Sequence, residues 1–390
     1  MNKTGQLLIA LLTLFAPLLA AAQQNTPVRV VNVVELSGDG KIAGTNFHNG
    51  LMLAFKQINE AGGILGRQIS VSTLDTATDS ELAKLMVQQA ADIGAYAIMG
   101  PVFSASVLAS MPVIAEARIP SFVGAEAAEI TEKGNPYIFR TSFTQATAMP
   151  KLARYIKTGV RASSVAMVWV NNPFGKGGRD QMVRALEAEG LRLAGEISTE
   201  PRQTDFTAVV EELSQFNADA AFIYLNEDES VLILQELLKQ NFGKPILGET
   251  TLLSQKVIEL AGTAADGILG HVGLTPEALV PGIRDFDTAF IRHHGYKSDH
   301  NGMKGYIGAY VLKAVTERIG NFDSQALAEA MKGVDLRVEQ HPRILLDVKY
   351  DQKGDLDRVS FIVRVVGGRH QFIATVPALG ADAPASAVAK

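Results

Sequence analysis

The sequence contains no cysteine among its 390 residues. This absence excludes disulfide bonds, thiol nucleophiles, zinc–thiolate sites and lipid attachment to a cysteine. The chain also lacks long runs of one charge sign, and its formal net charge is −5. A nucleic-acid or anionic-membrane surface requires a concentrated basic patch, so we expect no nucleic-acid partner.

The familiar signatures of catalysis are missing as well. The sequence has no G-x-S-x-G and no H-E-x-x-H motif. His293 and His294 are adjacent, so on a helix they would point to different faces, which does not suit one metal ion. We therefore expect no enzymatic activity, no cofactor and no metal site. An exported α/β enzyme is the alternative, and a nucleophile with a base in reach would favour it.

Long hydrophobic runs are absent except near the N-terminus. There Lys3 precedes an apolar stretch at 7–19, and three alanines end it at Ala22. This is the three-part order of a secretory signal peptide. A membrane-spanning helix needs roughly 20 apolar residues, so we expect residues 1–22 to be cleaved near Ala22. The expected location is the periplasm, without membrane insertion; an uncut N-terminal anchor is the alternative.

From residue 28 onward, short apolar runs alternate with amphipathic stretches. Most runs are followed by a polar loop and then by apolar residues at helical spacing. This order predicts an α/β fold with parallel sheets and helices on both faces, and the chain length predicts two domains. The expected strands are 28–34, 69–74, 95–99, 119–123, 165–170, 220–225 and 245–248.

The pattern changes near the C-terminus. Residues 344–348 and 359–366 flank a turn at 351–354, which predicts an antiparallel pair. A strand at 371–376 is expected after a second, glycine-rich turn. The tail 377–390 is rich in alanine and proline and has too little apolar bulk to pack, so we expect it to be disordered.

Two loops between a strand and a helix resemble nucleotide-binding motifs. The loop at 38–43 fits G-x-G-x-x-A, but the acidic Asp75 lies farther along than the fingerprint requires. A turn that faces a ligand is the better interpretation. The loop at 171–178 lacks the lysine–serine or lysine–threonine ending of a phosphate loop, and a tight strand-to-helix connection explains it.

A third such loop, at 100–106, carries Ser104 and Ser106 at the start of a helix. Their hydroxyls and the N-terminal amides could together receive a carboxylate. A plain helix cap is the alternative for a serine here. Acidic residues also follow several strands, where ligands bind in doubly wound folds, although a solvated loop rim has the same composition. These residues are Glu126, Glu227, Asp228, Glu229 and Glu249.

Short motifs occur along the chain in a specific order and spacing between residues 28 and 366. They lie at 35–38, 58–66, 98–101, 137–141, 174–175, 205–206 and 351–355. Their combination resembles the periplasmic substrate-binding proteins of ABC importers, in particular the leucine/isoleucine/valine-binding branch of the type I fold. The resemblance implies two doubly wound, Rossmann-like lobes with the ligand clamped between them.

The resemblance also implies that the chain crosses between the lobes three times, near 140–143, 271–275 and 346–351. Each lobe is then discontinuous. Lobe 1 would consist of 28–142 plus 274–348. Lobe 2 would consist of 143–273 plus 349–376.

In this family the first lobe holds the ligand's carboxylate through a serine that matches Ser104, with Ala105 and Ser106 in the same turn. Gly124 and Ala125 match the next contact motif. Glu126 departs from it, because the amino-acid binders usually have threonine there. The carboxylate end of the site is thus implied to be retained.

The second lobe departs further from the family pattern. Phe174 stands where tyrosine is frequent, and Asn226 with Glu227 replaces an aromatic pair. Glu249 and Thr250 lie around the acidic position that receives a ligand's ammonium group, and Tyr306 completes the candidate set. An unpaired carboxylate facing hydrocarbon is costly, so a purely aliphatic ligand side chain is disfavoured.

We therefore expect a monomeric receptor that captures a small amino-acid-like ligand by hinge closure and delivers it to an ABC permease in the inner membrane. The ligand would carry a carboxylate and a polar or amine-bearing remainder. A sensory module that binds an amide, a urea-like solute or an aromatic acid is the alternative.

Overall fold

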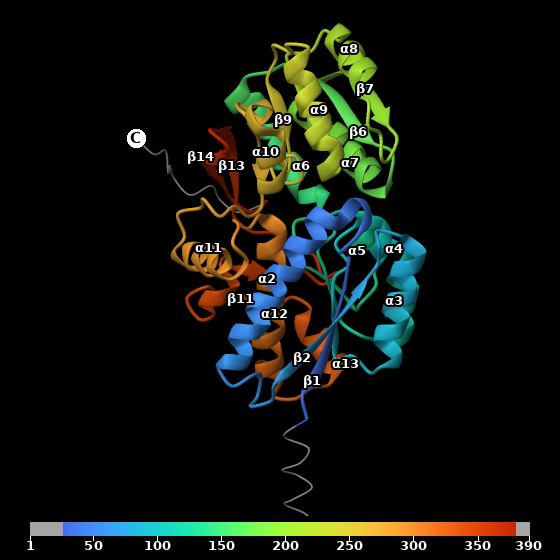
Figure 1. Ribbon diagram of the computed structural model, residues 1–390, viewed down its shortest axis with the longest axis vertical. Helices are drawn as coiled ribbons and strands as arrows, with labels where there is room; N and C mark the ends of the chain where they lie inside the picture. Colours follow the sequence, from blue (N-terminus) through green and yellow to red (C-terminus); the bar gives the residue numbers. More distant parts are fainter. Residues whose placement is uncertain (1–25, 380–390) are drawn as a thin grey trace, which may run out of the picture.

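The computed structural model describes residues 26–379, which form two lobes arranged along the long axis of the molecule (Figure 1). The predicted signal peptide at 1–22 lies outside the described residues, as does most of the tail predicted at 377–390. The structure places 377–379, where the backbone amide of Leu379 donates to Asp357 Oδ2 at 2.6 Å.

One lobe is built on a parallel sheet with strand order β2-β1-β3-β4-β5. The valine-rich β1 is buried apart from Arg29 because helices cover both faces of the sheet. Strand order reverses between β1 and β3, so the loops after these two strands flank a crevice at their carboxyl ends. The strands are β1 (Val28–Val34), β2 (Ile69–Asp75), β3 (Ala97–Met99), β4 (Ser121–Val123) and β5 (Ile138–Arg140).

The helices of this lobe come from two distant parts of the chain. The long α2 and α12 lie side by side (Figure 1), and their contact is close because it uses glycines. A Cβ atom at Gly50 would lie 1.8 Å from the carbonyl oxygen of Gly302. The helical elements are η1 (Gly38–Gly40), α2 (Lys41–Glu60), α3 (Ser80–Asp92), α4 (Ser104–Ala117), α5 (Glu129–Glu132), α11 (Pro281–His294), α12 (His300–Ile319) and α13 (Ser324–Met331).

The other lobe contains a mixed sheet with strand order β14-β13-β10-β9-β8-β6-β7. Its strands β6 to β10 are parallel, and β13 and β14 add an antiparallel hairpin beside β10. The strands are β6 (Ser164–Val170), β7 (Arg192–Thr199), β8 (Ala220–Tyr224), β9 (Ile246–Gly248), β10 (Leu269–Val272), β13 (Ser360–Val366) and β14 (Arg369–Val376).

The helices of this lobe cover both faces of the mixed sheet. α9 and α10 pack together over one part of it, while α6 packs against α7. They are α6 (Gln145–Tyr155), the π-helical turn η2 (Ile156–Val160), α7 (Pro173–Glu189), α8 (Thr207–Gln215), α9 (Glu227–Lys239), α10 (Gln255–Ala261) and η3 (Gly262–Ala265).

The predicted α/β fold with two doubly wound lobes is confirmed, and each expected strand before residue 250 overlaps an observed one. The predicted antiparallel pair of 344–348 with 359–366 is wrong. β12 (Val348–Lys349) pairs with β11 (Asp335–Leu336), and η4 (Pro342–Ile344) occupies the preceding residues. The left-handed φ of 66° at Leu345 breaks the apolar run, and Gly367 with Gly368 turns β13 back on β14 instead.

The chain passes between the two sheets after β5, after β10 and between β12 and β13. The buried guanidinium of Arg140 fixes the first of these passages. It donates to the carbonyl oxygens of Ala125 and Ala127, each at 2.7 Å, and it is paired with Asp355 beside the third passage. The hydroxyl of Tyr350 donates to the carbonyl oxygen of Arg140 at 2.6 Å. Two passages are thereby tied to each other.

No helix between residues 26 and 379 is both long enough and apolar enough to cross a membrane.

Candidate ligand-binding site

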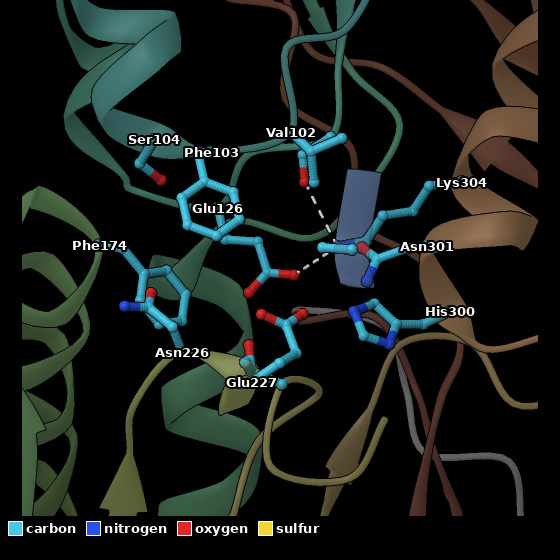
Figure 2. A pocket seen from close by; sticks show the side chains of 13 residues that line it. Val102, Phe103, Ser104, Glu126, Phe174, Asn226, Glu227, His300, Asn301 and Lys304 are labelled. Carbon is cyan, nitrogen blue, oxygen red and sulfur yellow. Dashed lines mark hydrogen bonds and ion pairs between the residues drawn. The ribbon is translucent and has the colours of Figure 1, made fainter. Parts of the chain in front are cut away.

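A pocket of about 380 Å³ lies between the lobes, at the carboxyl ends of strands from both sheets (Figure 2). Its wall combines polar side chains with the apolar side chains of Ala43, Val102, Phe103 and Phe174, and apolar atoms form the larger part of the exposed wall. The lining residues are Ala43, Val102, Phe103, Ser104, Gly124, Glu126, Phe174, Asn226, Glu227, Thr251, His300, Asn301 and Lys304.

Ser104 is the first residue of α4 and lines the pocket from the first lobe. Its buried Oγ accepts a hydrogen bond from the backbone amide of Ala127 at 3.2 Å. Because a serine hydroxyl can also donate, its proton remains available to an acceptor in the pocket. The buried Nδ2 of Asn301 has no hydrogen-bond partner between residues 26 and 379, so it is a second available donor on the pocket wall.

Ser106 does not line the pocket. Its side chain lies behind the pocket wall, where it contacts the carboxylate of Glu35. The carboxylate of Glu35 accepts from the backbone amides of Val102 and Phe103 at 3.1 and 3.2 Å. The Ser106 hydroxyl also bonds to it, and burial raises the pKa of Glu35. Sequence reasoning missed this role. The available signal was an acidic residue at the end of an apolar strand.

Glu126 forms a buried ion pair with Lys304. Lys304 Nζ lies 2.7 Å from Glu126 Oε1 and 3.3 Å from the carbonyl oxygen of Gly124, and the Ser142 hydroxyl donates to the same carboxylate at 3.2 Å. The side chains are 3% exposed for Lys304 and 9% for Glu126. Burial raises the pKa of Glu126, and the ammonium of Lys304 opposes that shift. Lys304 was not predicted, since a single lysine near the start of a helix carries no pattern of its own.

The opposite wall includes the first turn of α9. Asn226 caps this helix, and its side-chain and backbone nitrogens donate to Glu229 Oε2 at 2.9 and 3.0 Å. This capping box fixes the adjacent Glu227, which is 4% exposed. The backbone amide of Glu227 itself faces its carboxyl group as a hydrogen-bond donor. Burial raises the pKa of Glu227 to about 8.

Phe174, on α7, forms an apolar part of the pocket wall. Its ring stacks on Tyr224 with 4.3 Å between centroids, and Gln145 Nε2 donates to the Tyr224 hydroxyl at 2.9 Å. A Cβ atom at Gly178 would lie 2.0 Å from the Tyr224 ring, so this glycine permits the stack. The phenyl ring is therefore held from behind by fixed neighbours.

Glu249 and Thr250 lie behind the pocket wall, next to the lining residue Thr251. The Thr250 hydroxyl donates to Glu249 Oε1, and Nδ1 of the buried His271 lies 3.1 Å from the same oxygen. Burial raises the pKa of Glu249 to about 7 and lowers that of His271 to about 3. An acidic side chain thus approaches the pocket without lining it.

The remaining candidates lie outside the pocket lining. Ala105 is on α4, and the carbonyl oxygen of Ala125 accepts from Arg140. Tyr306 is fully buried in α12, where its hydroxyl donates to Gln57 Oε1 at 2.7 Å and its ring packs on Phe286. The structure therefore groups Ser104, Gly124, Glu126, Phe174, Asn226 and Glu227 around one space and places the others apart from it.

The two lobes also meet at the rim, where Arg202 Nε lies 2.5 Å from Asp39 Oδ2. Asp39 belongs to the turn that resembles a dinucleotide fingerprint. Asp75 does not extend toward a ribose site, because its carboxylate accepts from the backbone amides of Leu36 and Ser37 and from the Ser37 hydroxyl. The turn is thus held in place for contact with the other lobe.

No cluster of three or more histidine, aspartate and glutamate side chains within 26–379 has the arrangement of a metal site. The ring of His300 faces the pocket (Figure 2), and burial lowers its pKa well below the usual value, so it stays neutral. The pocket lining offers hydrogen-bonding and ionisable side chains, among them Ser104, Glu126 and Glu227.

Comparison with known proteins agrees with this architecture. A leucine binding protein from Thermotoga maritima superimposes with a TM-score of 0.82 at 22% identity over 90% of this chain and 99% of that one. A solute binding protein of an R. palustris ABC transporter, in complex with benzoate, has a TM-score of 0.83 at 20% identity, covering 91% and 98% of the two chains. At this level of identity the two likenesses establish the fold.

Sequence comparison extends the likeness to a family. "Leu/Ile/Val-binding protein homolog 1" of Brucella melitensis is 24% identical over 325 residues, which is 83% of this chain and 85% of that protein. The family model described as periplasmic binding protein matches residues 27–369. That match spans nearly the whole described chain, and we conclude that this protein belongs to the periplasmic binding protein family.

Proposed function

We propose that the protein is the periplasmic solute receptor of an ABC importer. It captures a small ligand with a carboxylate and an amine-bearing or polar remainder, and presents it to a permease in the inner membrane. The observation that carries the proposal is the pocket between the lobes, which has the Ser104 hydroxyl on one lobe and the Glu227 carboxyl on the other.

The donors of the first lobe support a carboxylate at one end of the ligand. Ser104 offers a hydroxyl proton at the start of α4, and Asn301 offers a buried amide nitrogen. Lys304 uses two of its three N–H donors on Glu126 and Gly124, which leaves one. Several converging donors offset the hydration that a carboxylate loses in the pocket.

The second lobe supports a polar or amine-bearing group at the other end. Glu227 and Asn226 border the pocket there, and only the ring of Phe174 offers an extended apolar surface on that side. A ligand hydrocarbon against the Glu227 carboxyl would leave a buried polar group without a partner, which costs free energy. An ammonium or amide group avoids this cost.

Contacts on both lobes support hinge closure as the mechanism of capture. A ligand that bridges Ser104 and Glu227 interacts fully only when the lobes are close, so its binding energy shifts the equilibrium toward the closed state. The exposed Asp39–Arg202 ion pair at the rim joins the lobes in the same arrangement. The permease then recognises the closed, loaded form.

Isothermal titration of the purified protein against amino acids, amides and aromatic acids tests the proposal. The expected result is binding of a solute that carries both a carboxylate and an amine or amide group. Binding of leucine-like solutes alone would contradict the assignment of the polar end. Identification of co-purifying solute by native mass spectrometry gives an independent check.

A further inference from the structure

The ionisable groups around the pocket are unbalanced in charge. Among the lining residues, all of which lie within the described 26–379, Lys304 is the only lysine or arginine, and Glu126 and Glu227 are both acidic. Lys304 is already paired with Glu126. Glu227 is thus a buried carboxyl group at the pocket surface without a cation of its own.

Among the residues that the structure describes, the immediate surroundings of Glu227 also lack a free cation that could pair with it. Its carboxyl group points across the pocket toward Glu126, with the ring of His300 beside it (Figure 2). Asp299 and Glu126 both raise its pKa, whereas Lys304 lowers it, and burial is the largest cause of the shift to about 8. A buried carboxyl group with another carboxyl group opposite and no cation of its own favours its protonated form at neutral pH.

Apart from Lys304 of α12, which is paired with Glu126, the described groups that face Glu227 from neighbouring elements are acidic or neutral. From the start of α12 come Asp299, whose pKa burial raises to about 6, and the neutral His300. From the loop after β4 comes Glu126, already paired with Lys304. On the second lobe lies Glu249, whose pKa is raised to about 7. A cation for Glu227 has to come from the ligand.

We propose that Glu227 exchanges its proton for the cationic nitrogen of the ligand, so that capture of the ligand releases one proton. This inference rests on the proposed receptor function and narrows its ligand class. The ligand is a small carboxylic acid with a protonated amine or amidine at the end away from Ser104. The O–H bond of Glu227 breaks, its proton passes to water or buffer, and a ligand N–H donates to the resulting carboxylate.

The proposal predicts how the affinity for the ligand changes with pH. Below the pKa of about 8 in the free protein, the ligand has to displace a proton, so its apparent association constant falls by up to about tenfold per pH unit. It should rise close to tenfold from about pH 6.5 to 7.5 and level off above about pH 8.5. At pH 7, nearly one proton should be released per ligand bound.

The first test needs no ligand. Protein labelled with ¹³C at the glutamate carboxyl carbons is titrated by NMR, and the Glu227 signal is assigned by its loss in Glu227→Gln. We expect a midpoint near 8 for this signal in the free protein. A Glu227 that is ionised throughout the range from about pH 6 to 8 would overturn the inference, whatever the protein binds.

The second test uses matched probes in calorimetry at pH 7, in phosphate and in Tris, which differ in protonation enthalpy. The amine-bearing probe is 4-(aminomethyl)benzoate, whose amine lies at the end away from the carboxylate, and it is compared with 4-methylbenzoate. The amine-bearing probe should bind with release of about one proton, and the probe without the amine should bind more weakly and release none. Equal binding of both members of the pair, or amine binding without proton release, would overturn the inference.

Two variants test whether proton release on ligand binding depends on the side chain of Glu227. Glu227→Gln should abolish proton release and weaken an amine-bearing probe by about tenfold or more, because its counter-charge is lost. Asp228→Asn, the exposed neighbour in the same helix turn, is the matched control and should leave proton release unchanged. If no probe binds, the proposed ligand class fails, while the NMR titration still decides the protonation of Glu227.

Discussion

Replacement of Lys304 by methionine should destabilise the protein because it removes one partner of a buried ion pair. Methionine retains most of the volume of lysine but leaves the buried Glu126 carboxylate without its cation, next to the Ser142 hydroxyl and the Glu249 carboxyl group. Loss of one partner from a buried pair costs about 3–5 kcal/mol. In a lobe of this size, that corresponds to a decrease of roughly 6–20 °C in Tm.

The pH dependence of the Tm difference between wild type and Lys304→Met tests whether the unpaired Glu126 carboxylate causes the loss of stability. Without Lys304, the pKa of Glu126 rises further above its ordinary value of 4.5, since the ammonium opposes the effect of burial. An acidic group whose pKa is higher in the folded than in the unfolded state does not reduce the free energy of unfolding at pH values below its unfolded-state pKa. As the pH rises through the folded-state pKa, the group ionises in the folded protein and the free energy of unfolding decreases. Scanning calorimetry should therefore find a larger difference in Tm between wild type and Lys304→Met at pH 8 than at pH 5.

The double variant Lys304→Met, Glu126→Gln is the control. It removes the charge that the single variant leaves unpaired, so it should recover most of the lost stability. A decrease of less than about 2 °C for Lys304→Met at pH 8, or a double variant no more stable than the single one, would refute the reasoning.

Three further changes test the site and the fold. Ser104→Ala should weaken a carboxylate ligand by about tenfold to a hundredfold in calorimetry, because a hydrogen bond to a charged group is lost. Arg202→Ala should change affinity by less than about fivefold, since the pair with Asp39 is exposed, and it should reduce the salt dependence of binding between low and high ionic strength. Gly50→Ala should lower the Tm strongly, because its Cβ would lie 1.8 Å from the Gly302 carbonyl oxygen; an unchanged Tm would contradict the close packing of α2 and α12.

The sequence predicts the parallel parts of both sheets well because buried parallel strands appear as short continuous apolar runs. Residues 28–34 are predicted with the observed bounds of β1. The prediction fails where an apolar run is interrupted by backbone geometry. Between residues 342 and 350, a 3₁₀ turn and a left-handed Leu345 divide the run, so that Val348 pairs with Leu336 instead of β13. Composition does not show such a break.

The strands that the sequence does not indicate have other causes. β5 and β10 are short, with three and four residues, and a run of that length is also compatible with a loop. β7 lies at the sheet edge and mixes polar and apolar residues, including Arg192 and Glu196. β7 is a strand because it pairs with β6, although its own sequence pattern does not predict one.

Part of the candidate site follows from the rule that ligands gather at the carboxyl ends of parallel strands. Glu126 and Glu227 each follow a strand, and both line the pocket. His300, Asn301 and Lys304 follow no strand, because they belong to α12, which returns to the first lobe from far along the chain. Only the three-dimensional packing of α12 brings them to the pocket.

The buried pair of Glu126 and Lys304 also explains why the pocket can contain so much acid. A carboxylate after β4 would be too costly alone, and the lysine 178 residues later compensates for it within the same lobe. Lys304 is the cation among the lining residues, and it is paired with Glu126. Glu227 on the opposite lobe therefore has no cationic partner in the lining, which lies within residues 26–379. Compensation within one lobe thus leaves a charge requirement on the other, and in the proposed mechanism a ligand that meets this requirement draws the two lobes together.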